Sequence, residues 1–183
     1  INKAEALGTG GVQFPFQTST TAGPWNGTGW FSAYLKSNYN RDLTGKLISA
    51  TVTVFAAPGT AFWTRSSACD NTGIDAYVRL EFQSATGNYD ASDYWWSTGA
   101  NSLRLSAIAN SGPQVLNFST ADPSAWSNID GQTGLQNPAG FAAALKNVKE
   151  IGVAFGSTCR YASGVNVSGG TASFQLNSYT VTP

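Results

Sequence analysis

Three polar side chains alternate along one short segment of this sequence. Tyr77, Arg79 and Glu81 stand two residues apart in 76–82, a spacing that places them on the same face of a β-strand. Arg104, from a second alternating segment, is expected to neighbour them. A phenol, a guanidinium and a carboxylate in line suit a sugar with several hydroxyl groups. A cross-strand Arg–Glu pair on a solvated face explains the pattern equally well, so both interpretations stand.

Tryptophan is the second candidate set, because sugars stack their C–H faces on indole rings and the chain has six of them. Trp95 and Trp96 are adjacent, so on a strand at most one of them faces the core. For any single tryptophan, packing in the core is the commoner role. We nevertheless expect glycan binding to rest on an exposed indole, with Trp95 or Trp96, Trp63 and Trp126 as the candidates.

Catalysis is the less favoured hypothesis. Glycoside hydrolysis needs two carboxylates that face each other across a cleft, and the three glutamates show no clustered signature. Glu150 directly precedes an apolar segment, which predicts a position at the end of a sheet. The chain has no histidine, which excludes His-based triads, His-ligated metals and His general bases. If the protein is an enzyme, the candidates are Glu81, Tyr77 and Arg79, as in a polysaccharide lyase or hydrolase.

Oxygen ligands and cysteines suggest two structural features. Asn88, Asp90 and Asp93 offer three oxygen side chains within one turn, as a structural calcium site might, although Asp and Asn are also ordinary turn formers. Cys69 and Cys159 are too few for a zinc site. Outside the cell, an even count favours one disulfide between them.

Charge limits the classes of partner. Only 11% of the residues are charged, and ten basic residues balance ten acidic ones. No net field therefore attracts the chain to nucleic acid or to an anionic membrane. The sequence contains no run of eighteen apolar residues, so it predicts no membrane span. A surface rich in hydroxyls and amides is typical of secreted proteins that handle polysaccharides, so we expect an extracellular location.

Alternation of apolar and polar residues defines the elements that must position these side chains. It recurs in segments separated by Gly, Asn, Ser and Pro clusters, which predicts an all-β, antiparallel two-sheet β-sandwich. The segments are 49–55, 76–82, 102–106, 150–155 and 171–181. We find no linker or repeat, so 1–183 is expected to be a single domain in which 1–12 form a mobile leader.

One stretch has a helical period instead. Phe141, Leu145 and Val148 recur at spacings of four and three in an alanine-rich segment, and Pro138 stands where a helix tolerates a missing N–H. We expect one short helix near 139–147 that caps an end of the sandwich.

The order of three segment types resembles that of β-jelly-roll carbohydrate-binding modules of secreted glycanases. An aromatic-rich region and a Gly-Lys entry into a strand come first, an aromatic strand lies mid-chain, and a pair of long strands closes the domain. Laminin-IV-like and galactose-binding-like sandwiches share this layout. The segments are 29–34 with 40–47, 93–97, and 145–155 with 170–181.

The resemblance implies a jelly roll that binds a polysaccharide or oligosaccharide without catalysis and that can belong to a larger multidomain enzyme. It implies no cofactor beyond the structural calcium considered above. Two alternatives remain from other classes: a small polysaccharide lyase or glycoside hydrolase on the same scaffold, and a structural or adhesive surface domain.

Overall fold

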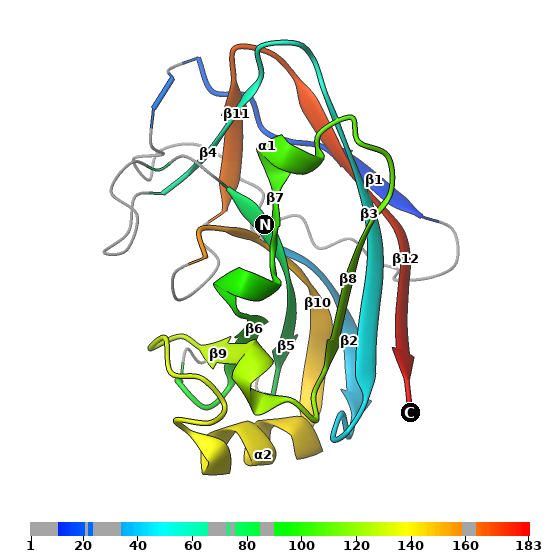
Figure 1. The fold of residues 1–183 in the computed structure, drawn as a ribbon, viewed down its shortest axis with the longest axis vertical. Helices are drawn as coiled ribbons and strands as arrows, with labels where there is room; N and C mark the ends of the chain where they lie inside the picture. Colours follow the sequence, from blue (N-terminus) through cyan, green and yellow to red (C-terminus); the bar gives the residue numbers. More distant parts are fainter. Residues whose placement is uncertain are drawn as a thin grey trace.

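The structure is a computed structural model and describes residues 11–20, 22–23, 34–65, 73, 76–84, 90–158 and 164–183. Two antiparallel sheets face each other across one hydrophobic core, which confirms the predicted all-β sandwich (Figure 1). The four-stranded sheet has the order β1 (Val12–Pro15), β12 (Ala172–Thr182), β3 (Leu47–Ala56) and β8 (Gln114–Ser119).

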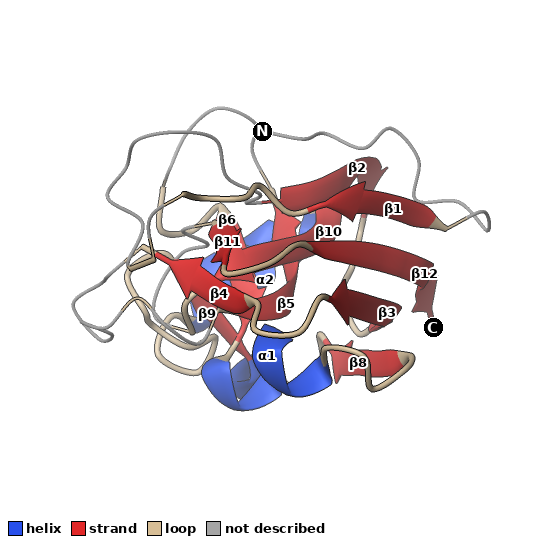
Figure 2. Cartoon of the chain, turned by 90° about the horizontal axis from the view of Figure 1, so that it is seen from above, coloured by secondary structure: helices blue, strands red, loops and turns tan. Residues whose placement is uncertain are grey.

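The six-stranded sheet forms the other layer (Figure 2). Its path is β2 (Tyr34–Arg41), β10 (Val148–Gly156), β5 (Tyr77–Gln83), β6 (Tyr94–Ser97) and β9 (Trp126–Asn128), and β7 (Leu103–Arg104) pairs with β5. A small third sheet joins β4 (Ala61–Thr64) to β11 (Val165–Ser168).

Period-two alternation directs the core side chains of both sheets. Val52 and Val54 of β3 are fully buried between the sheets, and so are Leu80 and Phe82 of β5. Burial of such side chains contributes about 1.5–3 kcal/mol each. The faces of β5 are therefore assigned as the sequence predicts.

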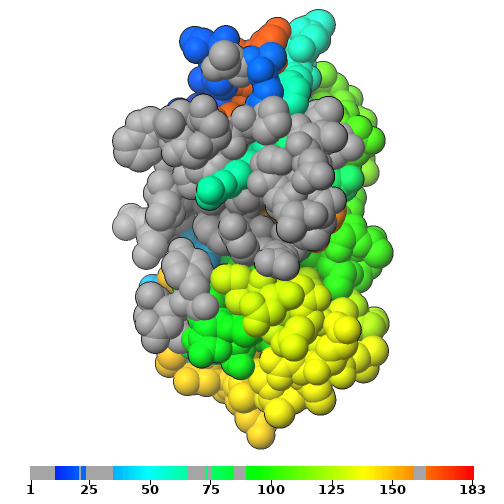
Figure 3. All heavy atoms as spheres, turned by 90° about the vertical axis from the view of Figure 1, so that its left-hand side faces the viewer, coloured from blue at the N-terminus to red at the C-terminus, as the bar shows by residue number. Residues whose placement is uncertain are grey.

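The helix α2 (Pro138–Lys146) confirms the predicted helix (Figure 1). The Asn137 side chain accepts a hydrogen bond from Gly140 N at 3.1 Å and so caps its first turn. Phe141 and Leu145 are buried, and Val148 is buried as the first residue of β10. In the space-filling view, residues with the colours of β9 and α2 form a continuous surface at one end of the molecule (Figure 3).

Three local expectations differ from the structure. The segment 102–106 is not one strand: β7 ends at Arg104, and the helical turn α1 (Leu105–Ile108) begins there because Leu105 and Ile108, three apart, both pack in the core. Glu150 lies within β10, not at the sheet end. The expected leader overlaps β1 at its last residue, because Val12 pairs with Leu176, and 1–10 lie outside the described residues.

Two short 3-10 turns, η1 (Gly99–Asn101) and η2 (Pro123–Ala125), connect the strands near β6 and β9. Among the residues that the structure describes, no helix is long and apolar enough to cross a membrane.

Candidate functional site

A row of facing residues crosses the outer face of the six-stranded sheet. Lys36 of β2 pairs with Gly152 of β10, Gly152 pairs with Glu81 of β5, Glu81 with Trp96 of β6, and Trp96 with Ser127 of β9. Residues that face each other across antiparallel strands share a face. The register alone therefore brings the side chains of this row together.

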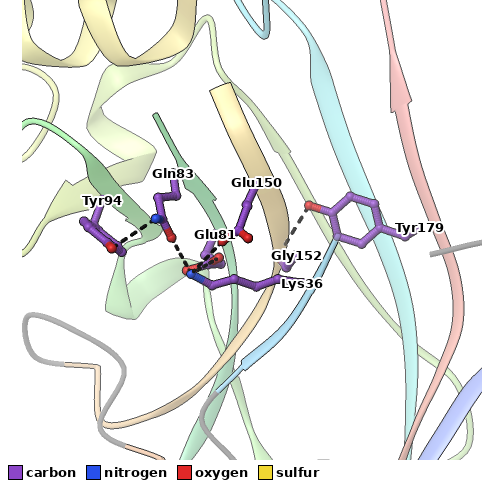
Figure 4. Close-up of polar contacts among 7 residues, drawn as sticks. All are labelled: Lys36, Glu81, Gln83, Tyr94, Glu150, Gly152 and Tyr179. Carbon is purple, nitrogen blue, oxygen red and sulfur yellow. Dashed lines mark hydrogen bonds and ion pairs between the residues drawn. The ribbon is translucent and has the colours of Figure 1, made fainter. Parts of the chain in front are cut away.

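Glycine at the second position of the row lies between its two charged residues. Lys36 and Glu81 are two strand spacings apart, roughly 9–10 Å across the sheet. Because Gly152 has no side chain, Lys36 extends over it, and its Nζ lies 3.1 Å from Glu81 Oε1 (Figure 4). A Cβ at Gly152 would overlap the carbonyl oxygen of Leu35 in the adjacent strand, so close approach of the strands also requires glycine here.

The Lys36 ammonium group also contacts two residues, Gln83 and Glu150, that face each other in the neighbouring row of the sheet. Lys36 Nζ donates a 2.6 Å hydrogen bond to Gln83 Oε1 and lies 3.8 Å from Glu150 Oε2 (Figure 4). Gln83 Nε2 in turn donates to the Tyr94 hydroxyl at 3.0 Å. We call Lys36, Glu81, Gln83, Tyr94, Trp96 and Glu150 the Lys36–Glu81 cluster.

Glu81 is the most perturbed acid of the cluster. Its side chain is fully buried, and this burial raises the pKa of its carboxyl from 4.5 to about 7. The Lys36 ammonium opposes the increase, whereas the negative charge of Glu150 adds to it. At neutral pH the group is therefore divided between its two protonation states and can either donate or accept a proton.

Tyr179 reaches the other side of the same row from β12 of the opposite sheet. Its hydroxyl donates to the carbonyl oxygen of Gly152 at 3.4 Å (Figure 4). Burial, with a contribution from the Glu81 charge, holds the pKa of Tyr179 well above its usual range. The phenol therefore stays neutral and ties the two sheets together beneath the cluster.

Two aromatic rings form the β6 side of the cluster. The rings of Tyr94 and Trp96 stack with centroids 6.0 Å apart, and Lys36 Nζ lies 5.4 Å from the Tyr94 centroid. The Arg79 guanidinium lies 5.8 Å from the Trp96 ring. Both cations are within the range of cation–π attraction.

Three buried polar atoms of the cluster lack a hydrogen-bond partner among the described residues: Glu81 Oε1, Glu81 Oε2 and Trp96 Nε1. Glu81 and Lys36 form an ion pair, which favours the charged form of the carboxyl. Buried donors and acceptors of native proteins are nearly always paired, so these three atoms require partners beyond the side chains that the structure describes.

Trp95 and Trp126 are buried in the core, so the exposure expected of Trp126 was wrong, and of the pair Trp95 and Trp96 it is Trp95 that faces the core. Both are fully buried on the inner face of the sheet, where they surround Phe82. Trp95 Nε1 donates to Ser92 O at 3.1 Å and Trp126 Nε1 donates to Ser119 O at 3.0 Å. Each indole is a satisfied core residue.

Trp96 and Trp63 have different surroundings. Trp96 is also fully buried, which contradicts the expected exposure, but it lies on the outer face beside Glu81. Trp63 is half-buried in β4 and donates from Nε1 to Ser168 Oγ at 2.7 Å. It lies in the small third sheet, outside the cluster.

The predicted line of Tyr77, Arg79 and Glu81 is present on the outer face of β5, and Arg104 faces Tyr77 from β7. Arg79 is buried, not solvated, and donates long hydrogen bonds to Ser97 O at 3.5 Å and Thr158 O at 3.4 Å. Glu81 forms its ion pair with Lys36. The solvated Arg–Glu pair, which was the alternative interpretation of this line, is therefore not what these residues form, because Arg79 is buried and another strand supplies the ion-pair partner of Glu81.

The calcium and disulfide predictions remain untested. Asp90 is exposed and accepts from Ser92 N at 2.9 Å, while Asp93 accepts from Ser84 Oγ at 2.8 Å, the ordinary bonds of turn residues. Asn88, Cys69 and Cys159 lie outside the described residues. In the part of the chain that is described, no three acidic residues or other metal ligands gather into a group.

Four residues of the cluster were not predicted as a site. Gln83 continues the period of Tyr77, Arg79 and Glu81, and Tyr94 precedes Trp96 by two, so alternation could have identified both. The remaining two, Lys36 and Glu150, join only through the register of β2 and β10 with β5, for which the sequence holds no local signal.

Comparisons of the chain with family models, curated proteins and solved structures find no match. The cluster itself therefore carries the functional argument.

Proposed function

We propose that the chain is a secreted, non-catalytic carbohydrate-binding module whose sugar contact is the Lys36–Glu81 cluster. One observation carries this proposal: at facing positions of β5 and β6, the Glu81 carboxyl oxygens and Trp96 Nε1 lack a hydrogen-bond partner among the described residues. Such facing side chains have Cβ atoms about 4.5–5.5 Å apart. A sugar hydroxyl both donates and accepts, so adjacent hydroxyls of one sugar can satisfy both groups. Because Glu81 and Trp96 are fully buried, this contact requires that the atoms covering them move aside when the sugar binds.

The ligand would bind through hydrogen bonds more than through stacking. The rings of Tyr94 and Trp96 already stack on each other, and cations lie over both. The partly exposed members of the cluster are Lys36 and Glu150, with 11% and 13% of their side chains accessible, and they mark the side from which a sugar approaches. The low overall charge of the chain supports a neutral glycan.

A glycoside hydrolase is the second candidate, and the pKa of Glu81 favours it. A carboxyl with a pKa of about 7 suits a general acid. Hydrolysis requires a second carboxylate, and Glu150, which also contacts the Lys36 ammonium, can supply it. In this scheme Glu81 protonates the glycosidic oxygen, and Glu150 acts as the nucleophile or as the base that activates water. Both schemes place the same sugar over the same two residues.

Calorimetric titration with soluble neutral oligosaccharides tests the binding proposal, with product analysis in parallel. Trp96→Phe removes the unpaired N–H, and Trp95→Phe is the matched control, because it makes the same change on the inner face. We expect Trp96→Phe and Glu81→Gln to weaken binding about five- to tenfold, the effect of one hydrogen bond, and Trp95→Phe to bind as the unmodified protein does.

Equal binding by Trp96→Phe and Trp95→Phe would contradict the proposed contact, as would the absence of binding to every glycan. Release of reducing ends or of an unsaturated product, abolished by Glu81→Gln, would establish the catalytic alternative.

A further inference from the structure

The four-stranded sheet is distinguished by its lack of charge. None of the residues in β1, β3, β8 and β12 is Asp, Glu, Lys or Arg. The charged residues that the structure describes lie on the six-stranded sheet, in α2, and in turns and other segments outside these strands. The two outer faces of the sandwich therefore differ in kind: one carries the Lys36–Glu81 cluster and the other carries no charge.

The strand register identifies the side chains of this outer face. Ala50 and Val52 of β3 are buried, so Ser49 and Thr51 point outward beside them. Thr53 follows in the same alternation but is itself buried and donates to Asn177 Oδ1 at 2.8 Å. Pairing with β12 and β8 places further hydroxyl and amide side chains beside them. Together with β1 these are Gln13, Ser173, Gln175, Asn177, Ser178, Thr180, Thr182, Asn117 and Ser119.

Apolar side chains that include Pro15, Phe55 and Val115 interrupt this polar face and are accessible to a partner. Phe55 is 45% exposed and Val115 is 57% exposed. The C–H faces of sugars pack on such groups, and the surrounding hydroxyls and amides both donate and accept hydrogen bonds, as sugar hydroxyls do. The face thus offers both kinds of contact that a neutral glycan makes.

The edge strand β1 is short and ends at Pro15, two usual protections against association, but neither edge strand of this sheet carries a charge. Edge strands of soluble proteins commonly carry lysines or inward-pointing charges, but β1 and β8 carry none. A charged macromolecule would meet no counter-charge here. A partner without charges avoids the desolvation of ionised groups on either side, and the cost that remains is that of desolvating hydroxyls and amides.

We infer that this outer face, formed by β1, β12, β3 and β8, is a second binding surface that lies flat on a neutral polysaccharide. At about 3.3 Å per residue β12 is roughly 35 Å long, and four strands span about 15 Å. Such an area covers several sugar units and more than one chain, so it suits an insoluble, multi-chain polysaccharide. The inference rests on the proposed function for the ligand class but uses different residues.

Isosteric substitutions that add charge test this surface. A triple variant converts three amides of the face to carboxylates: Gln13→Glu, Asn117→Asp and Gln175→Glu. A control variant adds the same charge at three positions outside the four strands: Asn40→Asp, Gln136→Glu and Asn147→Asp. Both are assayed by sedimentation with insoluble neutral glucan, mannan and chitin, and by calorimetry with soluble oligosaccharides.

We expect the on-face variant to lose about tenfold or more of its binding to one insoluble polymer, at low and high salt alike, while the control binds normally. Both variants should retain soluble ligand binding, which belongs to the Lys36–Glu81 cluster. Equal binding by the two variants to the insoluble polymer would overturn the inference and leave the proposed function intact. Loss of soluble binding by Trp96→Phe is the separate test of the cluster.

Self-association is the other outcome that would overturn the inference. If sedimentation velocity shows a dimer that only the on-face variant dissociates, the face joins two copies of this chain. Should the triple variant fail to fold, Phe55→Ser makes the same test through the apolar contact, with Leu135→Ser as its control at another exposed apolar residue.

Discussion

Trp95 and Trp96 are neighbours in the sequence, but they lie on opposite faces of the six-stranded sheet. Trp95 packs against Phe82 and Phe141 in the core and donates to Ser92 O. Trp96 stacks on Tyr94 outside the core, and its N–H has no partner among the described residues. One indole is thus a satisfied structural residue, while the other retains an unused donor.

The two phenylalanine variants should differ in stability for this reason. Each loses a similar volume from a fully buried site, but only Trp95→Phe also breaks a hydrogen bond. We expect Trp95→Phe to lower the free energy of unfolding by about 0.5–1.5 kcal/mol more than Trp96→Phe does. Urea denaturation of the pair measures the difference, and a larger loss in Trp96→Phe would contradict the assignment of faces.

Stability should depend on pH through Glu81. Because its pKa is about 7 in the folded chain and 4.5 ordinarily, the folded state holds the proton more tightly. Stability therefore rises as pH falls from 8 to 5, by roughly 2–3 kcal/mol from this group. Glu81→Gln should lack this component. Unfolding curves of the unmodified protein and of Glu81→Gln, recorded between pH 8 and pH 5, measure this component. If the difference in unfolding free energy between the two proteins is the same at every pH, the prediction is refuted.

The cap of α2 provides a prediction independent of the cluster. Asn137 accepts from Gly140 N in the first turn, so Asn137→Ala should cost about 1 kcal/mol of unfolding free energy. Asn137→Asp keeps the acceptor and should restore that stability. Thermal unfolding of the two variants compares them directly, and an equal loss in both would show that the cap contributes nothing.

The sequence was sufficient to predict the features of the fold that depend on local periodicity, namely strand faces and helices. Alternation assigned the two faces of β5, and the spacing of Phe141 and Leu145 located α2. It failed at 102–106, where the buried pair Leu105 and Ile108 turns the chain into a helix after only two strand residues. An alternating segment of five residues is too short to distinguish these outcomes.

The cluster could not be predicted in the same way because it depends on long-range register. Lys36 and Glu81 come from strands that both pair with β10, and their contact requires Gly152 between them. Burial was equally invisible: Glu81 looked like a solvated strand residue, and yet its side chain is fully covered. Which residues face each other across non-adjacent segments is a property of the packed sheets.

Replacement of Lys36 by methionine should show what holds Glu81 in place. The variant leaves the buried Glu81 carboxyl without its ammonium partner. Because the pKa of Glu81 in the folded chain is about 7, the carboxyl can take up a proton instead, so we expect a cost of about 1–1.5 kcal/mol at pH 8. The loss should shrink at pH 5, because Glu81 is then protonated in the folded state and needs no counter-charge. The double variant Lys36→Met with Glu81→Gln should regain most of the stability at pH 8. If Lys36→Met is equally destabilising at both pH values, the ammonium acts through packing, and the electrostatic account of the Lys36–Glu81 pair fails.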